Sequence, residues 1–440
     1  MTADNSTSEP PSPAGAGAQA RAIALLGRPK LWLLPTVLTG LLALLLSLLY
    51  MGGIVSPNRD LHDLPIGIVN ADRGEPLTGQ KENLGTQITR AVTTGPSDTS
   101  GTSGGGDKAE WRQLSLARAQ DQLDSGKLYG VLVVPEGFTA SVAALTGTSA
   151  TARPTLTVLT NPGKGSLGSS LASQITTQAA HQASATIGEQ LTASATRADG
   201  TAKLLLADPV TVTTQVGHPI GTHSGLGLST FYYTLLLVLA GFLGANVISN
   251  GVDTSLGYAD NEIGPWHTRR PTVPIDRTQT LLLKMGMTAG ITLLSVSLVM
   301  LATVGILDMD ADHLPLLWLY SYCATLAVGL GVQAINAAFG GIGQLVSMFV
   351  FIVLGLPSSG ATVPLQAVPG FYQFLAVFEP MRQLGDGVRA ILYFDARGDA
   401  GLTRAWTMIA IGAALALLFG FAMTRYYDRK GLERRTPQPS

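Results

Sequence analysis

The sequence contains a single cysteine, Cys323, in a chain of 440 residues. One thiol cannot form a disulfide within the chain, and it cannot supply the paired cysteines of a zinc or redox site. Cys323 lies in an apolar run, which indicates a small buried residue. The fold must therefore be stabilised without covalent crosslinks.

Charge is also scarce. Only 13% of the residues are charged, and 28 Lys and Arg against 29 Asp and Glu give a formal net charge of -1. The sequence therefore lacks the basic footprint that nucleic-acid binding requires, and it predicts no nucleic-acid partner. Hydrophobic residues make up 46% of the chain and the mean hydropathy is +0.29, which favours a membrane protein.

Catalytic and ligand-binding motifs are missing as well. Gly126-Lys127 and Gly163-Lys164 lack the preceding glycine spacing and the following hydroxyl residue of a P-loop. His218 and His223 have no further zinc ligands nearby. No nucleophile elbow or paired-carboxylate motif is present, so the sequence predicts no enzyme, no metal site and no cofactor.

Long apolar runs are abundant. A bilayer core of about 30 Å needs about 20 helical residues. Five regions are long enough: Leu31–Ile54, Ser224–Val252, Met285–Leu307, Leu314–Phe378 and Ala405–Thr424. Together they indicate an α-helical polytopic membrane protein.

The fourth run is too long for one crossing, because it has no charged residue over its whole length. Polar and glycine residues near its middle, Asn336, Gly340, Gly341 and Gln344, predict a turn. The run then supplies two helices, Leu314–Phe339 and Ile342–Leu356, and the chain about six transmembrane helices.

Lys and Arg set the expected orientation, because they concentrate on the cytoplasmic side of membrane proteins. They precede the first span, follow the last, and include Arg269, Arg270, Arg277 and Lys284 between the second and third. The connection 308–313 has none. We therefore expect a bacterial plasma-membrane protein with both termini in the cytoplasm.

Between the first two spans lies a segment long enough for a domain with its own core. Its patterns predict strands Leu64–Asn70, Leu128–Val134 and Thr155–Thr160, a helix through Trp111, Leu114 and Leu123, a helix to about Thr196 and an extended stretch Pro209–Val216. These patterns predict that the segment forms an inserted extracytoplasmic α/β domain.

The expected domains are a disordered cytoplasmic tail (1–20), a connecting helix with the first transmembrane helix (21–54), the extracytoplasmic α/β domain (55–227), a five-helix transmembrane domain (228–424) with an outer re-entrant segment at about 364–395, and a second cytoplasmic tail (425–440).

Amide side chains near the spans are candidates for a translocation path, because polar groups at membrane depth are costly unless they are used. These are Asn246, Asn250, Gln333, Asn336 and Gln344. Hydrogen bonding between helices is the alternative role. Glu379, Arg382, Asp386 and Arg389 recur at helical spacing and are also path candidates, lining an outer vestibule or forming a ladder of salt bridges.

The order of elements, with the blocks Ile66–Gly74, Ala119–Phe138 and Glu379–Arg382, resembles the ABC-2-type exporter permeases and their YhgE and Pip (phage infection protein) relatives. The chain departs from the Pip-like members because it lacks their long coiled-coil insertion.

The resemblance implies an amphipathic connecting helix at about Ala18–Lys30 and an ATPase-coupling element within Asp253–Arg277. The coupling candidates are Asp260, Glu262, Trp266, Arg269 and Arg270, although the arginines also serve topology. It implies membrane lipid, a separate ABC ATPase subunit, and a homodimer or a heterodimer with a sister permease as partners.

The sequence thus predicts an exporter permease subunit that moves an amphipathic or lipid-like solute outward. The alternative is a non-transporting envelope anchor, or a secretion or phage-infection accessory protein, whose outer domain binds a partner.

Overall fold

The computed structural model describes residues 29–77, 79–94, 108–145, 153–194, 208–263, 265–268 and 270–432. The chain divides into two compact units after Gly52. The first unit contributes one described helix, α2 (Pro29–Gly52), which is 24 residues long and matches the first predicted span. The predicted tail 1–20 and nearly all of the predicted connecting helix fall outside the described residues.

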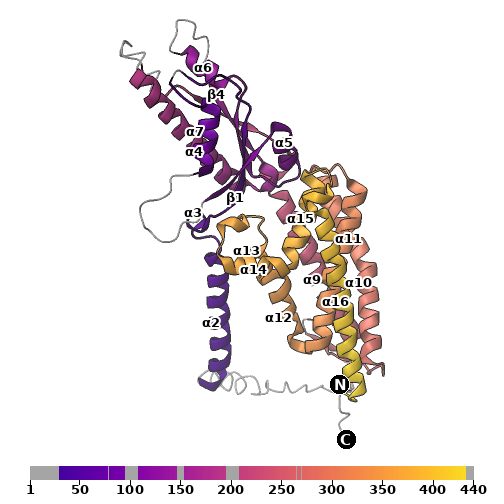
Figure 1. Ribbon diagram of the computed structural model, residues 1–440. Coiled ribbons are helices and arrows are strands. Elements are labelled where there is room, and N and C mark those ends of the chain that lie inside the picture. The colour runs from indigo at the N-terminus through magenta and orange to yellow at the C-terminus, as the bar shows by residue number, and fades with distance from the viewer. Residues whose placement is uncertain are drawn as a thin grey trace, which may run out of the picture. The chain divides into compact units, whose positions relative to one another are not determined.

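The second unit begins with an α/β part built on a five-stranded sheet (Figure 1). Its strands are β1 (Leu64–Asn70), β2 (Ala109–Leu114), β3 (Gly130–Val134), β4 (Thr155–Thr160) and β5 (Thr211–Val216). They lie in the order β2-β1-β3-β4-β5, and only the β3–β4 pair is antiparallel. The strands at 64–70 and 155–160 match the predicted bounds.

Helices cover both faces of this sheet. They are α4 (Leu84–Thr94), α5 (Leu116–Asp124), α6 (Phe138–Ala144) and α7 (Ser166–Ser194), and the short helix α3 (Pro57–Asp60) precedes β1. Ile68 of β1 joins a core formed with α4, α6 and α7, while its neighbour Val69 joins a core formed with α5. Because neighbouring residues in a strand point to opposite faces, β1 is buried on both sides.

One predicted helix is wrong. Trp111 and Leu114 belong to strand β2, and the helix begins only at Leu116. The spacing of these two residues suits a helix, but Ser115 caps α5 by accepting a hydrogen bond from the backbone N–H of Arg118, which places them before the helix start.

Four helical stretches in the described part of the chain are long and apolar enough to cross a membrane. They are Ser229–Ser255, Arg277–Ile306, Leu314–Ser358 and Leu402–Arg429. They contain α9 (Ser229–Ser255), α10 (Arg277–Met300), α11 (Leu314–Phe339), α12 (Gly343–Met348), α13 (Gly355–Ser358) and α16 (Leu402–Arg429). This fits a multi-pass membrane protein, and the count of six spans stays a prediction.

The stretch Leu314–Ser358 folds back on itself. Gly340 ends α11 with φ +60°, a left-handed conformation that glycine adopts easily. A Cβ atom on Gly331 would lie 2.6 Å from the Phe351 ring, whereas 20 residues of straight helix would separate the two by about 30 Å. The predicted hairpin is therefore confirmed, with α12, the π-helical turn Phe349–Val353 and α13 forming its second arm.

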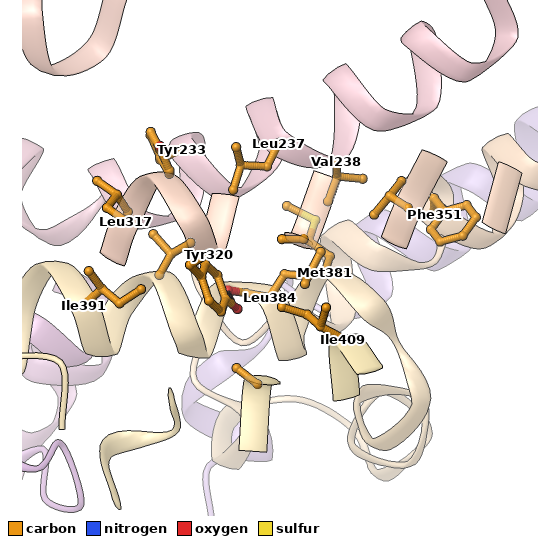
Figure 2. Packing of buried hydrophobic residues seen from close by; sticks show 14 of the residues in the cluster. Tyr233, Leu237, Val238, Leu317, Tyr320, Phe351, Met381, Leu384, Ile391 and Ile409 are labelled. Atoms are coloured by element: carbon orange, nitrogen blue, oxygen red, sulfur yellow. Dashed lines mark hydrogen bonds between the residues drawn. The ribbon is translucent and has the colours of Figure 1, made fainter. Parts of the chain in front are cut away.

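Two further helices, α14 (Gly370–Phe378) and α15 (Pro380–Tyr393), follow the hairpin and break at Pro380. Figure 2 shows how Leu384 and Ile391 of α15 pack with residues of α9, α11 and α16. Within this cluster of packed side chains, the hydroxyl of Tyr320 donates a hydrogen bond to the backbone oxygen of Leu384 at 2.9 Å.

The segment between α9 and α10 carries a two-stranded antiparallel hairpin. Its strands are β6 (Asn261–Ile263) and β7 (Trp266–Thr268). The sequence patterns gave no sign of this hairpin, because each strand has only three residues.

Candidate functional site

Three of the amide path candidates meet between α9, α10 and α11. The Gln333 side-chain amide donates to the backbone oxygen of Ala245 at 2.9 Å and to the Thr288 hydroxyl at 3.2 Å. The amide of Asn336 donates to Oδ1 of Asn246 at 3.0 Å. These contacts match the alternative role of interhelical hydrogen bonding.

Asn250 and Gln344 do not join this group. Both side chains are exposed on the described chain. Asn250 lies one helical turn beyond Asn246 on α9. The structure thus separates the five amide candidates into three that form hydrogen bonds near α9, α10 and α11, with Asn246 and Gln333 buried and Asn336 half-buried, and two that are exposed.

A buried ion pair lies beside the amide group. The Lys284 ammonium is 2.9 Å from Oδ1 of Asp253 and 2.9 Å from the hydroxyl of Ser249, and Lys284 is only 6% exposed. The sequence interpretation placed Lys284 in the connection before the third span, whereas the structure places it within a helix. The residue lies about two turns inside α10, because that helix already begins at Arg277.

Sequence reasoning missed this pair as a site, although one signal was present. Asp253 and Lys284 have opposite charge and flank two adjacent spans. Together with Gln333 and Thr424, Lys284 lines a small pocket of about 20 Å³.

The charged residues of α15 form the predicted ladder. Asp386 lies between two arginines, with Oδ2 3.6 Å from Arg382 Nε and Oδ1 3.2 Å from Arg389 Nη1. Glu379 does not join it through its side chain, because Oε2 of Glu379 accepts from the backbone N–H of Arg382 at 2.9 Å and caps α15.

Arg389 also borders a small cavity. The cavity has a volume of about 10 Å³, which is room for about one water molecule, and lies between the start of α9, the turn after α13 and α15. Its wall includes Thr230, Thr234, Ser359 and Arg389. Arg389 is 8% exposed, and its Nε atom has no hydrogen-bond partner in the described part of the chain. The ladder and this cavity therefore share one residue, Arg389.

The α/β part meets the helices through the short turn Pro162–Lys164. A Cβ atom on Gly163 would lie 3.0 Å from the Phe394 ring, and one on Gly165 would lie 3.2 Å from the backbone oxygen of Ala361. A Cβ atom on Gly227 would lie 2.6 Å from the backbone oxygen of Pro162. The turn is thus held closely between the end of α15, the start of α9 and the loop after α13.

Polar contacts reinforce this junction. The Lys127 ammonium is 2.6 Å from Asp399, and Arg397 lies 2.8 Å from Asp121 and 3.1 Å from Asp399. Arg397 and Lys127 hold the pKa of Asp399 down to about 2. His218, considered in the sequence for zinc, instead places its ring nitrogens 2.9 Å from Asp124 and 2.6 Å from the backbone oxygen of Tyr393.

Lys164 projects from the same turn. Its ammonium lies 5.0 Å from the centre of the Tyr129 ring. Burial, followed by the charge of Arg389, lowers the pKa of Lys164 to about 8. Burial raises the pKa of Tyr129 to about 12.

The ATPase-coupling candidates lie on the β6–β7 hairpin and its flanks. Trp266 is 72% exposed, Arg270 is exposed, and Asp260 lies 3.6 Å from the ring of His267. Glu262 is placed in β6 by its backbone. Arg269 lies outside the described residues.

Comparison with known proteins assigns the chain to a family. The model for a protein family described as "Protein of unknown function (DUF3533)" matches residues 36–412. The chain belongs to this family. The DUF3533 match starts within α2 and ends within α16, so it covers the α/β part and nearly all of the helices.

One solved structure is similar to part of the DUF3533 chain. It is a crystallised domain of a candidate ABC type-2 transporter from Thermotoga maritima MSB8, with 16% identity, a TM-score of 0.23, and alignment over 38% of this chain and 98% of that one. Similarity at that level carries no functional argument. A search of curated protein sequences gives no significant match.

Proposed function

We propose that this DUF3533 protein is the permease subunit of an ABC-2-type exporter. It moves an amphipathic or lipid-like solute outward across the plasma membrane, and a separate ATPase subunit supplies the energy. The α/β part is then extracytoplasmic, and the hairpin between α9 and α10 faces the cytoplasm. The support comes from the resemblance in element order and from the arrangement of the polar groups.

The observation that carries the proposal is how the polar groups of the candidate spans are used. Asp253 is paired with Lys284, and the amide nitrogens of Gln333 and Asn336 donate to neighbouring helices. A carrier driven by protons or ions needs intramembrane carboxylates that can change their charge. The four described spans contain two carboxylates, both half-buried: Asp253, which is paired with Lys284, and Asp428, which accepts hydrogen bonds from Arg277 and Thr278. Buried Glu379 lies outside these spans and caps α15. We therefore place the energy source on a partner.

The exposed hairpin supplies a surface for such a partner. A tryptophan that is 72% exposed is costly on a free surface and is the residue type that most often anchors protein interfaces. Acidic Asp260 and basic Arg270 flank it, which gives the surface both signs of charge. The proposal also includes a second permease copy or a sister permease to enclose the pathway.

The test is affinity purification from the native membrane, followed by identification of co-purifying chains and measurement of ATP hydrolysis. Trp266→Ala is expected to lose the ATPase. Leu226→Ala is the matched control, because Leu226 is 81% exposed at the opposite end of α9 and is expected to retain it. Absence of an ATPase with the native protein, or equal recovery with both variants, contradicts the proposal.

A second candidate function is the envelope anchor with a partner-binding outer domain. A groove of about 1160 Å³ runs between α4, α7 and β2 and is lined by Ile88, Val92, Trp111 and Ala185 among others. An Ala185→Arg substitution would obstruct it. Loss of a co-purifying envelope protein in that variant, with no ATPase in either sample, would favour the anchor.

A further inference from the structure

We propose that the outer edge of strand β2, together with the groove beside it, binds an extended polypeptide segment of a partner by strand addition. The segment would lie along β2 as a sixth strand of the sheet and place every second side chain in the groove. The inference does not depend on the export proposal, because strand addition needs no ATPase and the test measures peptide binding alone.

The first support is the free edge of β2. This strand is outermost in the order β2-β1-β3-β4-β5, so only β1 pairs with it in the described sheet. The backbone N–H of Leu64 donates to the oxygen of Lys108 at 3.1 Å. Successive residues direct their backbone groups to opposite sides, so those of Ala109, Trp111 and Gln113 face away from β1. None of these groups bonds to another described residue, and such a row recognises another backbone.

The second support is that the groove reaches this edge. Four consecutive residues of β2, Lys108–Trp111, line the groove of about 1160 Å³. Neighbouring residues of a strand point to opposite faces of the sheet, so a groove lined by all four must run along the strand's edge. The other edge strand, β5, lines no part of this groove. The unpaired backbone groups and the groove therefore form one continuous surface.

The lining favours uncharged side chains in the occupant. Four glutamines of α4 and α7 add uncharged hydrogen-bonding groups to the groove. The charged lining residues Asp63, Lys108 and Glu110 all lie at the starts of β1 and β2. Between these parts lie the half-buried apolar residues Val92, Trp111, Ile175, Ala179 and Ala183. The groove thus suits a segment with small apolar or hydroxyl side chains.

A peptide accounts for both features, whereas a lipid tail accounts for one. An alkyl chain would cover the apolar residues, but it has no donor or acceptor for the backbone of Ala109, Trp111 and Gln113. A covered backbone group left unpaired costs about 1–3 kcal/mol. A peptide strand supplies backbone hydrogen bonds together with side chains at a spacing of two residues. Strand β2 extends over about 20 Å, which is the usual length of a paired strand.

The experiment measures binding of a synthetic peptide to the purified full chain in a neutral detergent. The probe alternates valine and threonine over the length of β2, with a lysine and a blocking group at each end. Two further peptides carry N-methyl groups on the valines or on the threonines, so each lacks the N–H groups of one edge. We expect one methylated peptide to bind at least about tenfold more weakly than the other, because it loses its hydrogen bonds to β2.

Gln113→Pro is the test variant in the protein. It removes an outward-facing N–H from an exposed position and leaves the ladder to β1 in place, and edge strands tolerate proline. We expect it to weaken peptide binding about fivefold or more. Ala185→Arg, which obstructs the groove, is a second test variant if Gln113→Pro does not fold.

Thr214→Pro is the matched control, because it places the same substitution on the opposite edge of the sheet. Thr214 is exposed on β5, and its N–H faces away from β4, because Gly217, three residues later, donates its N–H to Thr160 of β4. Thr214→Pro is expected to bind the peptide as the native protein does.

Four results would overturn the inference. The first is absence of peptide binding by the native protein, or equal binding of the two methylated peptides. The second is binding by Gln113→Pro and Ala185→Arg that equals binding by Thr214→Pro. The third is self-association of the native protein that Gln113→Pro abolishes, because the edge would then belong to a second copy. The fourth is tighter binding of dodecanoate than of the peptide, unaffected by Gln113→Pro, which would assign the groove to a lipid tail.

Discussion

The ammonium of Lys127 lies 2.6 Å from Oδ2 of Asp399, although 272 positions separate the two residues in the chain. Lys127 follows α5 in the α/β part, and Asp399 precedes α16. Arg397 adds contacts to both Asp399 and Asp121. The junction between the two parts therefore combines close packing at Pro162–Lys164 with an ionic contact at its rim.

This ionic contact can be measured by charge exchange. Lys127→Glu places like charges together and is expected to loosen the junction, and the double variant Lys127→Glu with Asp399→Lys is expected to restore it. Exposed pairs contribute about 0.2–1 kcal/mol, so the effect is small. Hydrogen exchange of residues 116–130 is the readout, and Glu110→Gln, which removes an exposed pair within β2, is the control. Strictly additive effects of the two substitutions would contradict the contact.

A glycine supports the same junction. Gly126 has φ +63°, and a Cβ there would lie 2.7 Å from the Phe394 ring. Gly137 has φ +70° with open space around it. Gly137→Ala therefore measures the left-handed backbone cost, about 1 kcal/mol, and Gly126→Ala is expected to cost clearly more. Thermal unfolding measures the stability of both variants. Equal losses of stability would show that the Phe394 ring moves aside at no cost in free energy.

Two glycines of α15 make opposite predictions. A Cβ on Gly387 would lie 2.1 Å from the Tyr320 hydroxyl, so Gly387→Ala is expected to displace Tyr320 from Leu384 and to destabilise the helices by about 1–3 kcal/mol. A Cβ on Gly385 meets only ordinary contacts at 3.7 Å. Gly385→Ala is expected to be neutral or stabilising, because alanine favours helix. The reverse order of melting temperatures would refute the packing described for α15.

The buried pair of Lys284 and Asp253 predicts a strong asymmetry between single and double variants. Lys284→Met removes the ammonium that lies 2.9 Å from Oδ1 of Asp253 and is expected to destabilise the protein by about 3–5 kcal/mol. Adding Asp253→Asn also removes the carboxylate charge and should recover most of the loss. Thermal unfolding in detergent provides the measurement, and a double variant no more stable than Lys284→Met would mean that the pair is not electrostatically coupled.

The sequence predicted best those elements whose pattern lies within one short run of consecutive residues. Strand Leu64–Asn70 and helix Leu314–Phe339 were predicted to the residue, because each is an apolar run bounded by turn residues or charge. Trp111 was wrongly placed in a helix. A single apolar spacing is compatible with the helical period and with the strand period, and pairing within the sheet makes this segment a strand.

The candidate site was less accessible to sequence reasoning. The ladder of Arg382, Asp386 and Arg389 follows from helical spacing, and the structure confirms it. The burial of Lys284 depends on Asp253 of another helix, and the cavity at Arg389 depends on three distant segments. Contacts between residues far apart in the sequence produce no periodic pattern from which they could be predicted.

The strand order has a mechanical consequence. The chain enters the sheet through β1, which is held by ladders on both sides, and leaves toward α9 from β5, which is held only by its six register pairs with β4. Tension applied between the helices and the far end of the α/β part would load these two attachments unequally. The sheet should therefore unzip first at β5, which makes this strand the weak point if the domain is pulled.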